Sequence, residues 1–522
     1  MPMLFSLASC GGGGGGGSAG TLTPPSGNWQ AGTFLPSASF ADRCVIPRLG
    51  TSDRQGTVLD QNNWLRSWSN ELYLWYSEIT DRNPAGYATS LDYFDVLLTT
   101  ATTPSGQDKD KFHFTYDTDD WEQLSQGGVE AGYGAEFALL ASRPPRRIVV
   151  AFTEPNTTAA TNLMRGDEVL QVDGVDAVNG NTQAIVDVLN AGLFPGAINQ
   201  NHTFVVRNTA GQQRTVTMTS SNITHIPVPI VTSFLSQGSM VGYIQFNDHI
   251  STAQTPLINA ITTLDNQNVT DLILDLRYNG GGYLDLASQL SYMIGNRTLT
   301  SGHTFERIVF NDKNPNRNPV TGETLAPTPF HSTTLQYPCP PNTPSCQPAA
   351  GPLPSLDLNN VYVITGPGTC SASESIINSL RGVGVNVYLI GSTTCGKPYG
   401  FYPTDNCGTT YFTIQFRGEN DADFGDYTDG FSPANQPAST RGTSVPGCSV
   451  ADDFTHAMGV VDEGRIAAAL AFRASNNQTC PTPSGFAAPG VSKATLFSKG
   501  DLGGLEVSKP AARLNRIIRR GS

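Results

Sequence analysis

The sequence predicts an α/β protein whose largest part contains a mostly parallel sheet. Between about residues 228 and 475, β-like runs such as "VTDLILDL" and "NNVYVIT" alternate with helical runs such as "SESIINSLRG". This alternation favours a parallel sheet, in which function lies beyond the carboxyl ends of the strands. A helical stretch and a stretch of short β-like runs precede it. At 522 residues, the chain is long enough for about three domains.

Composition limits the classes of protein to which the chain can belong. Charged residues make up 14%, the formal net charge is −13, and Gly and Pro number 54 and 35, which is typical of an acidic, loop-rich, soluble protein. No basic tract is large enough to indicate a nucleic-acid partner. The basic "ARLNRIIRRGS" at the end of the chain is expected to be a solvated tail, within a flexible region from 481 to 522.

The first twenty residues contain a short apolar run that ends at Cys10 and is followed by a glycine tract. The run resembles the lipobox of bacterial lipoproteins, in which Cys10 is acylated and the glycines form a tether. This resemblance implies an extracytoplasmic protein of the bacterial cell envelope or periplasm, attached to the membrane only through its lipid. Residues 21–55 are rich in Pro, Gly and Ser and are expected to form a linker.

The remaining eight cysteines are an even number, which fits disulfides in an oxidising compartment. Their positions suggest three pairs, without fixing the connectivity: Cys339 with Cys346, Cys395 with Cys407, and Cys448 with Cys480. Zinc is the alternative, but there is no C-x-x-C motif, so we expect no metal.

Residues 56–122 are expected to form a small helical domain. The run "LDQNNWLRSWSNELYLWYSEI" repeats large apolar side chains at helical spacing, and a second helix is predicted around "YATSLDYFDVLLTT". We interpret the apolar stripe as packing. Its members are Trp64, Trp68, Leu72, Trp75 and Tyr76.

Residues 128–222 resemble a PDZ domain of the type found in bacterial proteases. The segment "RGDEVLQVDG" matches a fairly specific PDZ motif, and the earlier segment "GYGAEF" matches the carboxylate-binding loop. Such a loop offers backbone N–H groups to the C-terminal carboxylate of a peptide, which adds a strand to the sheet edge. The alternative is another small β-rich domain. The loop residues are Gly132, Tyr133, Gly134, Ala135, Glu136 and Phe137.

A glycine-rich turn follows the predicted strand "LILDL". Its sequence, "RYNGGG", places Gly280 and Gly281 before a helix, where bare backbone N–H groups can approach an anion or oxyanion closely. The spacing matches neither nucleotide-binding glycine motif, so no nucleotide is expected. The remaining alternative is a plain tight turn.

Two readings compete for the segment "TGPGTCSASESIINSL", which follows the strand "VYVIT". Ser371 or Ser373 can cap the helix, with Glu374 completing the cap. Alternatively, Ser371 is a nucleophile at the helix N-terminus. The segment by itself does not decide between them.

A nucleophilic serine needs a base, and Lys397 in "TTCGKPYGFYP" is a candidate. It lies one helix and one strand after Ser371, which returns the chain beside the helix start in a parallel βαβ unit. It could act only as a neutral amine, so burial would have to lower its pKa from about 10.4 by a few units. Its uncharged neighbours suit that requirement, and an ordinary surface lysine is the alternative.

The order of these motifs resembles the C-terminal processing peptidase family, the tail-specific proteases. A helical domain, a PDZ-like domain, "LDLRYNGGG", "CSASE" and "GK" follow one another over most of residues 56–475. The resemblance implies a ClpP/crotonase-like α/β core at 228–475, with the PDZ-like domain inserted in it or preceding it. It implies a serine endopeptidase in which Ser371 is the nucleophile and Lys397 the base.

The same resemblance implies an oxyanion hole formed by Gly280 or Gly281 together with Ala372. Substrates would be proteins or peptides held by their C-termini, and no cofactor is expected. Two alternatives stay open: a non-catalytic PDZ-containing binding protein that retains the fold, and a crotonase-like acyl-CoA enzyme, in which the PDZ-like segment would have no role.

The sequence departs from the family at two places. Many members have a Gln that orients the base four residues after the Lys, where this chain has Phe401. Some relatives use a His from a segment before the PDZ domain, where this chain has Phe112, with His113 one step later. We therefore name no third catalytic residue. His249 is expected to be a loop residue, and the acidic run after 418 is expected to be a turn without calcium.

Overall fold

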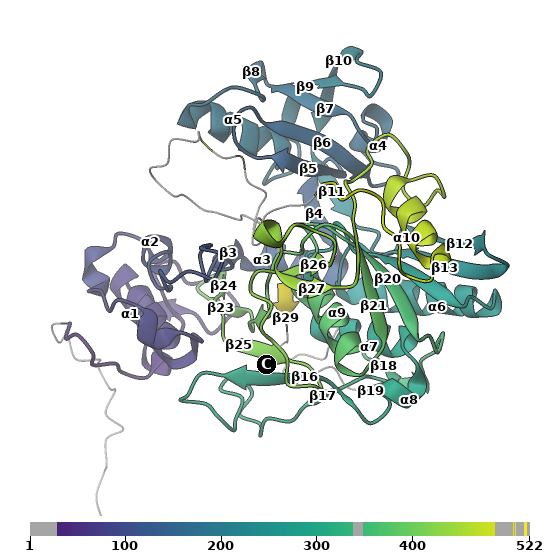
Figure 1. Ribbon diagram of the computed structural model, residues 1–522. Helices are drawn as coiled ribbons and strands as arrows, with labels where there is room; N and C mark the ends of the chain where they lie inside the picture. The colour runs from purple at the N-terminus through teal and green to yellow at the C-terminus, as the bar shows by residue number, and fades with distance from the viewer. Residues whose placement is uncertain (1–28, 338–347, 486–504, 506, 508–515, 519–522) are drawn as a thin grey trace, which may run out of the picture.

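The computed structural model describes residues 29–337, 348–485, 505, 507 and 516–518 (Figure 1). Its largest sheet has the strand order β12-β13-β14-β20-β21-β28, with β12 antiparallel to β13 and the other neighbours parallel. The strands are β12 (Ile230–Ser236), β13 (Ser239–Gln245), β14 (Asp271–Asp275), β20 (Asn360–Thr365), β21 (Asn386–Gly391) and β28 (Gly447–Ser449).

Helices cover both faces of this sheet, so its central strands are buried on both sides. Leu272 and Leu274 of β14 belong to the apolar cluster that includes α6 (Gln254–Asn266), α7 (Leu284–Ile294) and α9 (Ala372–Gly382). Ile273 points the other way, into the cluster that includes α10 (Gly464–Ala474). The predicted parallel α/β core is confirmed.

The PDZ-like domain stands at the top of Figure 1 as a sheet of order β10-β9-β7-β6-β5, with α5 (Gln183–Leu193) packed against it. Strand β5 is its open edge. A separate pair, β4 with β11, joins this domain to the core. The strands are β4 (Val129–Gly132), β5 (Ala135–Ala141), β6 (Arg147–Thr153), β7 (Glu168–Val172), β8 (Val175–Asp176), β9 (Asn201–Arg207), β10 (Gln213–Thr219) and β11 (Ser221–Thr224).

The N-terminal part is less helical than expected. Helix α1 (Val58–Leu72) stacks Trp64 on Trp68 at 5.1 Å between ring centroids, as the apolar stripe predicts, but it ends before Trp75. Helix α2 (Ser90–Phe94) is a single short turn, and β3 (Phe114–Asp117) pairs with β24 (Thr409–Phe412). A sheet therefore joins this N-terminal segment to β24, which lies much later in the chain.

Both segments expected to lack structure are in part folded. In the supposed linker, Phe40 is buried and Cys44 is bonded to Cys407. In the supposed flexible tail, Val507 is buried among PDZ-like core residues, and β29 (Arg516–Ile518) pairs in parallel with β15 (Gly281–Tyr283). Residues 1–28, including Cys10, lie outside the described residues.

The disulfides differ in part from the suggested pairs. Cys448–Cys480 is confirmed, but Cys395 bonds to Cys370 and Cys407 bonds to Cys44, so the pairing of Cys395 with Cys407 was wrong. Local proximity in sequence misled the prediction, because both true partners come from other elements. Cys339 and Cys346 lie outside the described residues.

Smaller strands and helices complete the fold. One sheet has the order β17-β16-β25-β22, and three smaller sheets join β23 with β24 and β3, β18 with β19, and β26 with β27. The bounds are β16 (Thr304–Phe310), β17 (Thr328–Pro329), β18 (Thr333–Leu335), β19 (Pro348–Pro352), β22 (Tyr399–Gly400), β23 (Thr404–Asn406), β25 (Phe416–Glu419), β26 (Phe431–Pro433), β27 (Thr443–Val445), α3 (Thr118–Glu122), α4 (Thr158–Asn162), α8 (Arg297–Thr300), β1 (Arg43–Cys44) and β2 (Arg54–Gln55).

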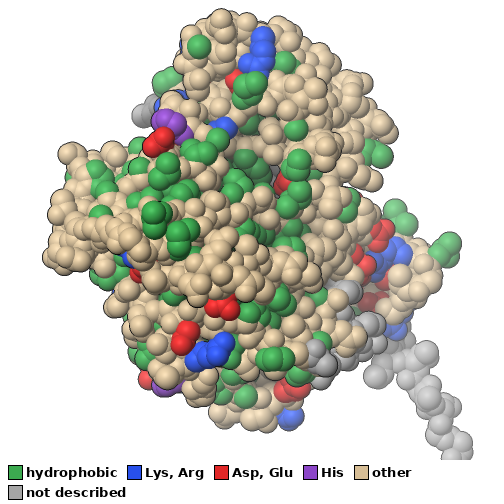
Figure 2. Space-filling view, turned by 90° about the vertical axis from the view of Figure 1, so that its right-hand side faces the viewer, with side chains coloured by type: hydrophobic (Ala, Val, Ile, Leu, Met, Phe, Trp, Pro, Cys, Tyr) green, Lys and Arg blue, Asp and Glu red, His purple; other side chains and the backbone are tan. Residues whose placement is uncertain are grey.

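Figure 2 shows few charged side chains on the face that it presents, and they are scattered over it rather than gathered by sign. No helix in the described ranges combines the length and the apolar character that a bilayer crossing requires.

A buried ion cluster fixes the segment that follows β14. The Arg277 guanidinium, 2% exposed, lies 2.8 Å from Asp275, 2.7 Å from Asp452 and 2.7 Å from Glu463. Burial would raise the pKa of Asp452, but Arg465, Arg277 and Arg165 hold it well below its usual range. The carboxylates of Asp275, Asp452 and Glu463 are thus balanced by the positive charge of arginine side chains.

Replacing Arg277 should therefore destabilise the fold strongly. We expect Arg277→Met to lower the free energy of unfolding by about 3 to 5 kcal/mol, because it leaves buried carboxylates without their counter-charge. Arg307→Met is the control, since Arg307 forms a partly exposed pair with Asp423 and should cost less than about 1 kcal/mol. Denaturant titration of both variants measures this, and equal losses would contradict the role of the cluster.

Candidate active site

Three loops meet where β14, β20 and β21 end. We call them the glycine loop (Arg277–Gly282), the serine turn (Gly366–Ser373) and the lysine loop (Ser392–Pro398). The Cys370 N–H donates to the Asn279 carbonyl oxygen at 3.1 Å, which joins the first two. The Cys370–Cys395 disulfide joins the second to the third. The expectation that these motifs converge at one sheet edge is confirmed.

Ser371 occupies a strained backbone position at the start of α9. Its φ of 63° and ψ of −119° are rare for a residue with a side chain, and it is fully buried. Such strain costs about 1 to 3 kcal/mol and is typical of functional turns. No described residue accepts a hydrogen bond from its Oγ–H, although the same oxygen takes part in the capping box of α9. The hydroxyl proton of Ser371 is therefore not committed to a neighbouring group.

Ser373 does not cap the helix, contrary to one of our readings. It lies inside α9, and its Oγ donates to the Asn279 carbonyl oxygen at 3.1 Å. This second contact between the serine turn and the glycine loop holds the two together. Ser371 is the N-cap residue instead.

Glu374 links the serine turn to the lysine loop through one buried carboxylate. It accepts hydrogen bonds from the backbone N–H of Ser371 at 3.0 Å, of Gly396 at 2.9 Å and of Lys397 at 2.8 Å, and also from the Thr394 hydroxyl. Burial raises the pKa of Glu374, and these four donors oppose that rise. Sequence reasoning saw only a capping residue here, although the S-x-x-E spacing was the available signal.

Lys397 is fully buried between two aromatic rings. Its Nζ lies 4.1 Å from the Phe401 centroid and 4.9 Å from the Phe112 centroid. Phe112 and Phe401 are the two residues at which the sequence is expected to depart from the family pattern, and the structure brings both to the lysine. Rings orient the amine through their faces and supply no hydrogen-bond acceptor of their own.

A second buried lysine lies next to the same ring. The Lys111 Nζ is 5.4 Å from the Phe112 centroid, and burial lowers the pKa of Lys111 to about 8 against the raising effect of Glu374. His113 turns away and stacks on Phe94 with centroids 3.8 Å apart, where burial lowers its pKa. The structure gives His113 a packing role.

The glycine loop is organised by a residue that we took for a simple loop residue. His249 is fully buried, and its Nδ1 lies 2.9 Å from the Asn279 Oδ1. The Asn279 Nδ2 donates to the Phe246 carbonyl oxygen, so Asn279 Oδ1 is the acceptor and His249 Nδ1 carries the proton. The same oxygen accepts the Gly281 N–H at 2.9 Å, so this N–H is already used within the loop.

Gly282 has to be glycine. Its φ is 141°, and a Cβ there would lie 2.4 Å from the His249 carbonyl oxygen. Only a residue without a side chain lets the two strands approach this closely.

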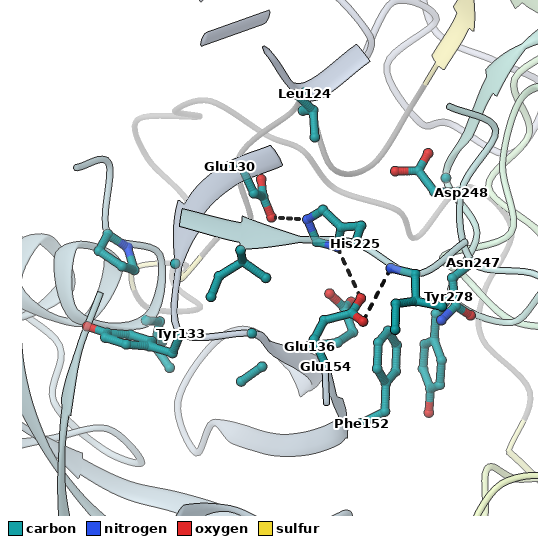
Figure 3. Close-up of a pocket in the computed structure, with 18 residues that line it drawn as sticks. Leu124, Glu130, Tyr133, Glu136, Phe152, Glu154, His225, Asn247, Asp248 and Tyr278 are labelled. Carbon is teal, nitrogen blue, oxygen red and sulfur yellow. Dashed lines mark hydrogen bonds and ion pairs between the residues drawn. The ribbon is translucent and has the colours of Figure 1, made fainter. Parts of the chain in front are cut away.

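A cleft between the PDZ-like domain and the core contains most of the expected carboxylate-binding loop. Residues 132–136 line it, together with Gly280, Asn247 and Asp248 of the core (Figure 3). Phe137 is buried in the PDZ-like core and does not line the cleft. The Tyr133 hydroxyl donates to the Gly192 carbonyl oxygen at 3.0 Å, which fixes the loop against α5.

His225 is held at this cleft by two carboxylates. It lies 2.7 Å from Glu130 and 3.2 Å from Glu154, as the dashed lines of Figure 3 mark. Burial would lower the pKa of His225, but the two hydrogen-bonded carboxylates raise it to about 10. The imidazolium therefore joins β4 to the segment after β11.

Metal ligation is not supported at the residues best placed for it. Cys370, Glu374 and Cys395 bring ligand atoms within 4.8 Å of one another. The two sulfurs form a disulfide, however, and only a single carboxylate is left. Elsewhere in the described ranges, no other group of three such residues is found.

Comparison with known proteins agrees with this geometry. Residues 240–402 match the family model Peptidase family S41. No curated protein gives a significant match to the chain. The structure is similar to that of a Bacteroides fragilis protein assigned as an S41 protease, with a TM-score of 0.55 and 19% identity over 80% of this chain and 98% of that chain. That likeness shows a shared fold.

Two further structures are similar at lower scores. A photosystem II D1 C-terminal processing protease has a TM-score of 0.42 and 19% identity over 73% of this chain and 92% of that chain. The PDZ domain of a Vibrio cholerae carboxy-terminal protease, solved with a peptide, has a TM-score of 0.15 and 18% identity over 18% of this chain and 97% of that chain.

The raised pKa of His225 predicts a pH-dependent contribution to stability. The contribution should be complete below the ordinary value of 6.5 and disappear as the pH rises through about 10. The loss of unfolding free energy in His225→Gln, relative to the unaltered chain, should therefore be largest near about pH 6 and shrink toward about pH 10. Chemical denaturation at both pH values checks this, and a loss that grows with pH would refute it.

Proposed function

We propose that the protein, whose residues 240–402 match Peptidase family S41, is an endopeptidase with a Ser371/Lys397 dyad. The observation that carries the proposal is the shared Glu374 carboxylate, which accepts from the backbone of both residues. It supports the view that the two positions are held as one unit. An unspent hydroxyl on a strained turn is what a nucleophile requires.

In this mechanism, Ser371 Oγ attacks the carbonyl carbon of a peptide bond while the neutral Lys397 amine takes its proton. The complete burial of Lys397 favours the neutral form. The lysine then returns the proton to the leaving amine as the C–N bond breaks, and an acyl-enzyme ester remains. Water, deprotonated by the same lysine, attacks the ester and releases the acid.

Backbone N–H groups would hold the oxyanion that forms in both steps. Ala372 supplies one, at the start of α9, where the helix dipole also favours negative charge. Gly280 supplies the other and lines the cleft. We proposed Gly281 as an alternative, but its N–H donates to Asn279 Oδ1, so Gly280 is the better donor.

The cleft beside the PDZ-like domain suggests how substrates are selected. Residues 132–136 and Gly280 line the same cleft, so a chain bound by its C-terminus at the PDZ-like loop would reach Gly280, the proposed oxyanion donor. We infer that substrates are proteins or peptides recognised at their C-termini. The three disulfides among the described residues fit an extracytoplasmic location, and acylation of Cys10 remains part of the proposal.

One observation favours a second candidate, a non-catalytic peptide-binding protein of the same fold. Phe401 stands where many relatives have the Gln that orients the base, and its ring faces Lys397. The PDZ-like cleft would then be the functional site.

The dyad is tested by single substitutions at Ser371 and at two buried lysines. Ser371→Ala and Lys397→Met should each lower the rate of cleavage of an unfolded protein by about 10³-fold or more. Lys111→Met is the matched control, because it removes the other buried amine beside Phe112 and should leave most of the activity. Full activity of Lys397→Met with loss in Lys111→Met would transfer the base to Lys111. Absence of cleavage by the unaltered chain would favour the binding protein.

The disulfide between the serine turn and the lysine loop should matter for rate as well as for stability. Cys370–Cys395 and Cys448–Cys480 close loops of similar length, with separations of 25 and 32 residues, so each should contribute about 3.5 kcal/mol.

Replacing both members of either pair by serine should therefore lower the melting temperature by similar amounts. Only the Cys370/Cys395 pair flanks the dyad, so only its loss should reduce kcat, by about 10- to 100-fold through misplacement of the reacting groups. Equal kcat in both double variants would show that the first disulfide has no positioning role.

A further inference from the structure

The short strand β15 lies between two other segments of the chain. On one side is His249, whose N–H donates to the Gly281 carbonyl oxygen at 3.2 Å and whose carbonyl oxygen accepts the Tyr283 N–H at 2.8 Å. On the other side is β29, which pairs in parallel with Gly282 opposite Ile517. The glycine loop of the active site thus continues into a three-stranded arrangement.

Alternation along a strand decides which backbone groups face β29. Because Gly281 and Tyr283 turn toward His249, the N–H and C=O of Gly282 turn to the other edge. In a parallel pair with Gly282 opposite Ile517, these groups meet the carbonyl of Arg516 and the N–H of Ile518. The C-terminal segment therefore uses the two hydrogen-bonding groups that an extended peptide would need at this edge.

Strand β29 lies beside two segments of the proposed active site. It pairs with the strand that continues the glycine loop, and it also lies close to β22, which begins two residues after Lys397. Figure 1 shows β29, in yellow, in the middle of the molecule between the N-terminal helices and α9. The segment thus runs between the proposed oxyanion donors and the proposed base.

The same part of the chain is also attached to the PDZ-like domain. Val507 is fully buried among its core residues, and its N–H donates to the Ser142 carbonyl oxygen at 3.0 Å, just beyond the open edge strand β5. Leu505 donates to Asn181 and accepts from Arg146. Two anchors on one chain raise the effective concentration of the segment between and beyond them.

Charge favours this placement. Residues 511–522 contain four arginines and no acidic residue, whereas the whole chain carries a net charge of −13. The cleft next to β15 is lined by Glu130, Glu136, Glu154 and Asp248, with His225 as its cation. A basic segment is therefore attracted to this part of the molecule.

We propose that the edge of β15 that faces β29 is a peptide-binding edge and that residues 516–518 of the same chain are its intramolecular ligand, which a substrate has to displace. The ligand class is an extended, basic polypeptide, held mainly by its backbone. The inference rests on the proposed function only where it calls the displacing peptide a substrate.

Binding is tested in the Ser371→Ala background, where no cleavage is needed. The probe is a fluorescent peptide with the sequence of residues 511–522, and the readout is anisotropy. A chain that ends at Ser508 keeps Val507 and should bind the probe about tenfold or more tightly than the full chain, because the competing segment is gone. In the full chain, Ile518→Pro should raise the affinity for the probe toward that of the shortened chain.

Ile518→Ala is the matched control, because it shortens the same side chain but keeps the N–H that would meet Gly282. It should bind the probe like the unaltered full chain. A probe with Pro in place of Ile518 should bind the shortened chain more weakly than a probe with Ala there. Equal affinity of the full and shortened chains, or equal affinity of the Pro and Ala probes, would overturn the inference.

The active enzyme supplies a second readout. With Ser371 intact, removal of residues 509–522 should lower KM for a peptide substrate by about tenfold or more and leave kcat unchanged, as expected when an intramolecular competitor is removed. If the unaltered chain does not cleave but the anisotropy results hold, the proposed function fails and the peptide-binding strand remains. If cleavage occurs and KM is independent of the tail, only the peptide-binding inference fails.

Discussion

The buried carboxylate of Glu374 is the interaction on which the rest of the site depends. It is fully buried, and three backbone N–H groups and one hydroxyl donate hydrogen bonds to it, which opposes the rise in its pKa that burial causes. Because those donors come from both the serine turn and the lysine loop, satisfying the carboxylate fixes the two loops relative to each other. A buried charge that lost these partners would be costly, so the arrangement is held to one geometry. The strained backbone at Ser371 is maintained by the same contacts.

Two different sets of polar groups fix the glycine loop, one at its beginning and one at its middle. Arg277 holds its beginning through three carboxylates, and Asn279 with His249 holds its middle. Both sets are buried, so they are unaffected by solvent screening and resist movement. The loop therefore offers its backbone groups in a pre-organised form, which is what stabilisation of a developing oxyanion requires.

The two segments that we propose to bind peptide, the PDZ-like loop and the glycine loop, line the same cleft. The cleft extends from residues 132–136 of the PDZ-like domain to Gly280 of the core. The described parts of the C-terminal segment contact the PDZ-like domain at Val507 and the glycine loop at 516–518. In the proposed function, one polypeptide would engage both domains at once, as the described parts of the C-terminal segment do.

The sequence by itself determined the α/β core, its parallel strands, the convergence of the glycine, serine and lysine motifs, and the PDZ-like domain. These follow from periodicity and from motifs local in sequence, and local signals suffice because a βαβ unit places successive strand ends at one edge. Only the tertiary structure decided what surrounds Lys397, because Phe112 comes from a distant segment and the path of the chain after Lys397 decides that the Phe401 ring faces the amine. It also decided that Cys370 rather than Cys407 bonds to Cys395, and that the tail returns to β15. Such contacts depend on how remote parts of the chain pack, and no local pattern encodes that.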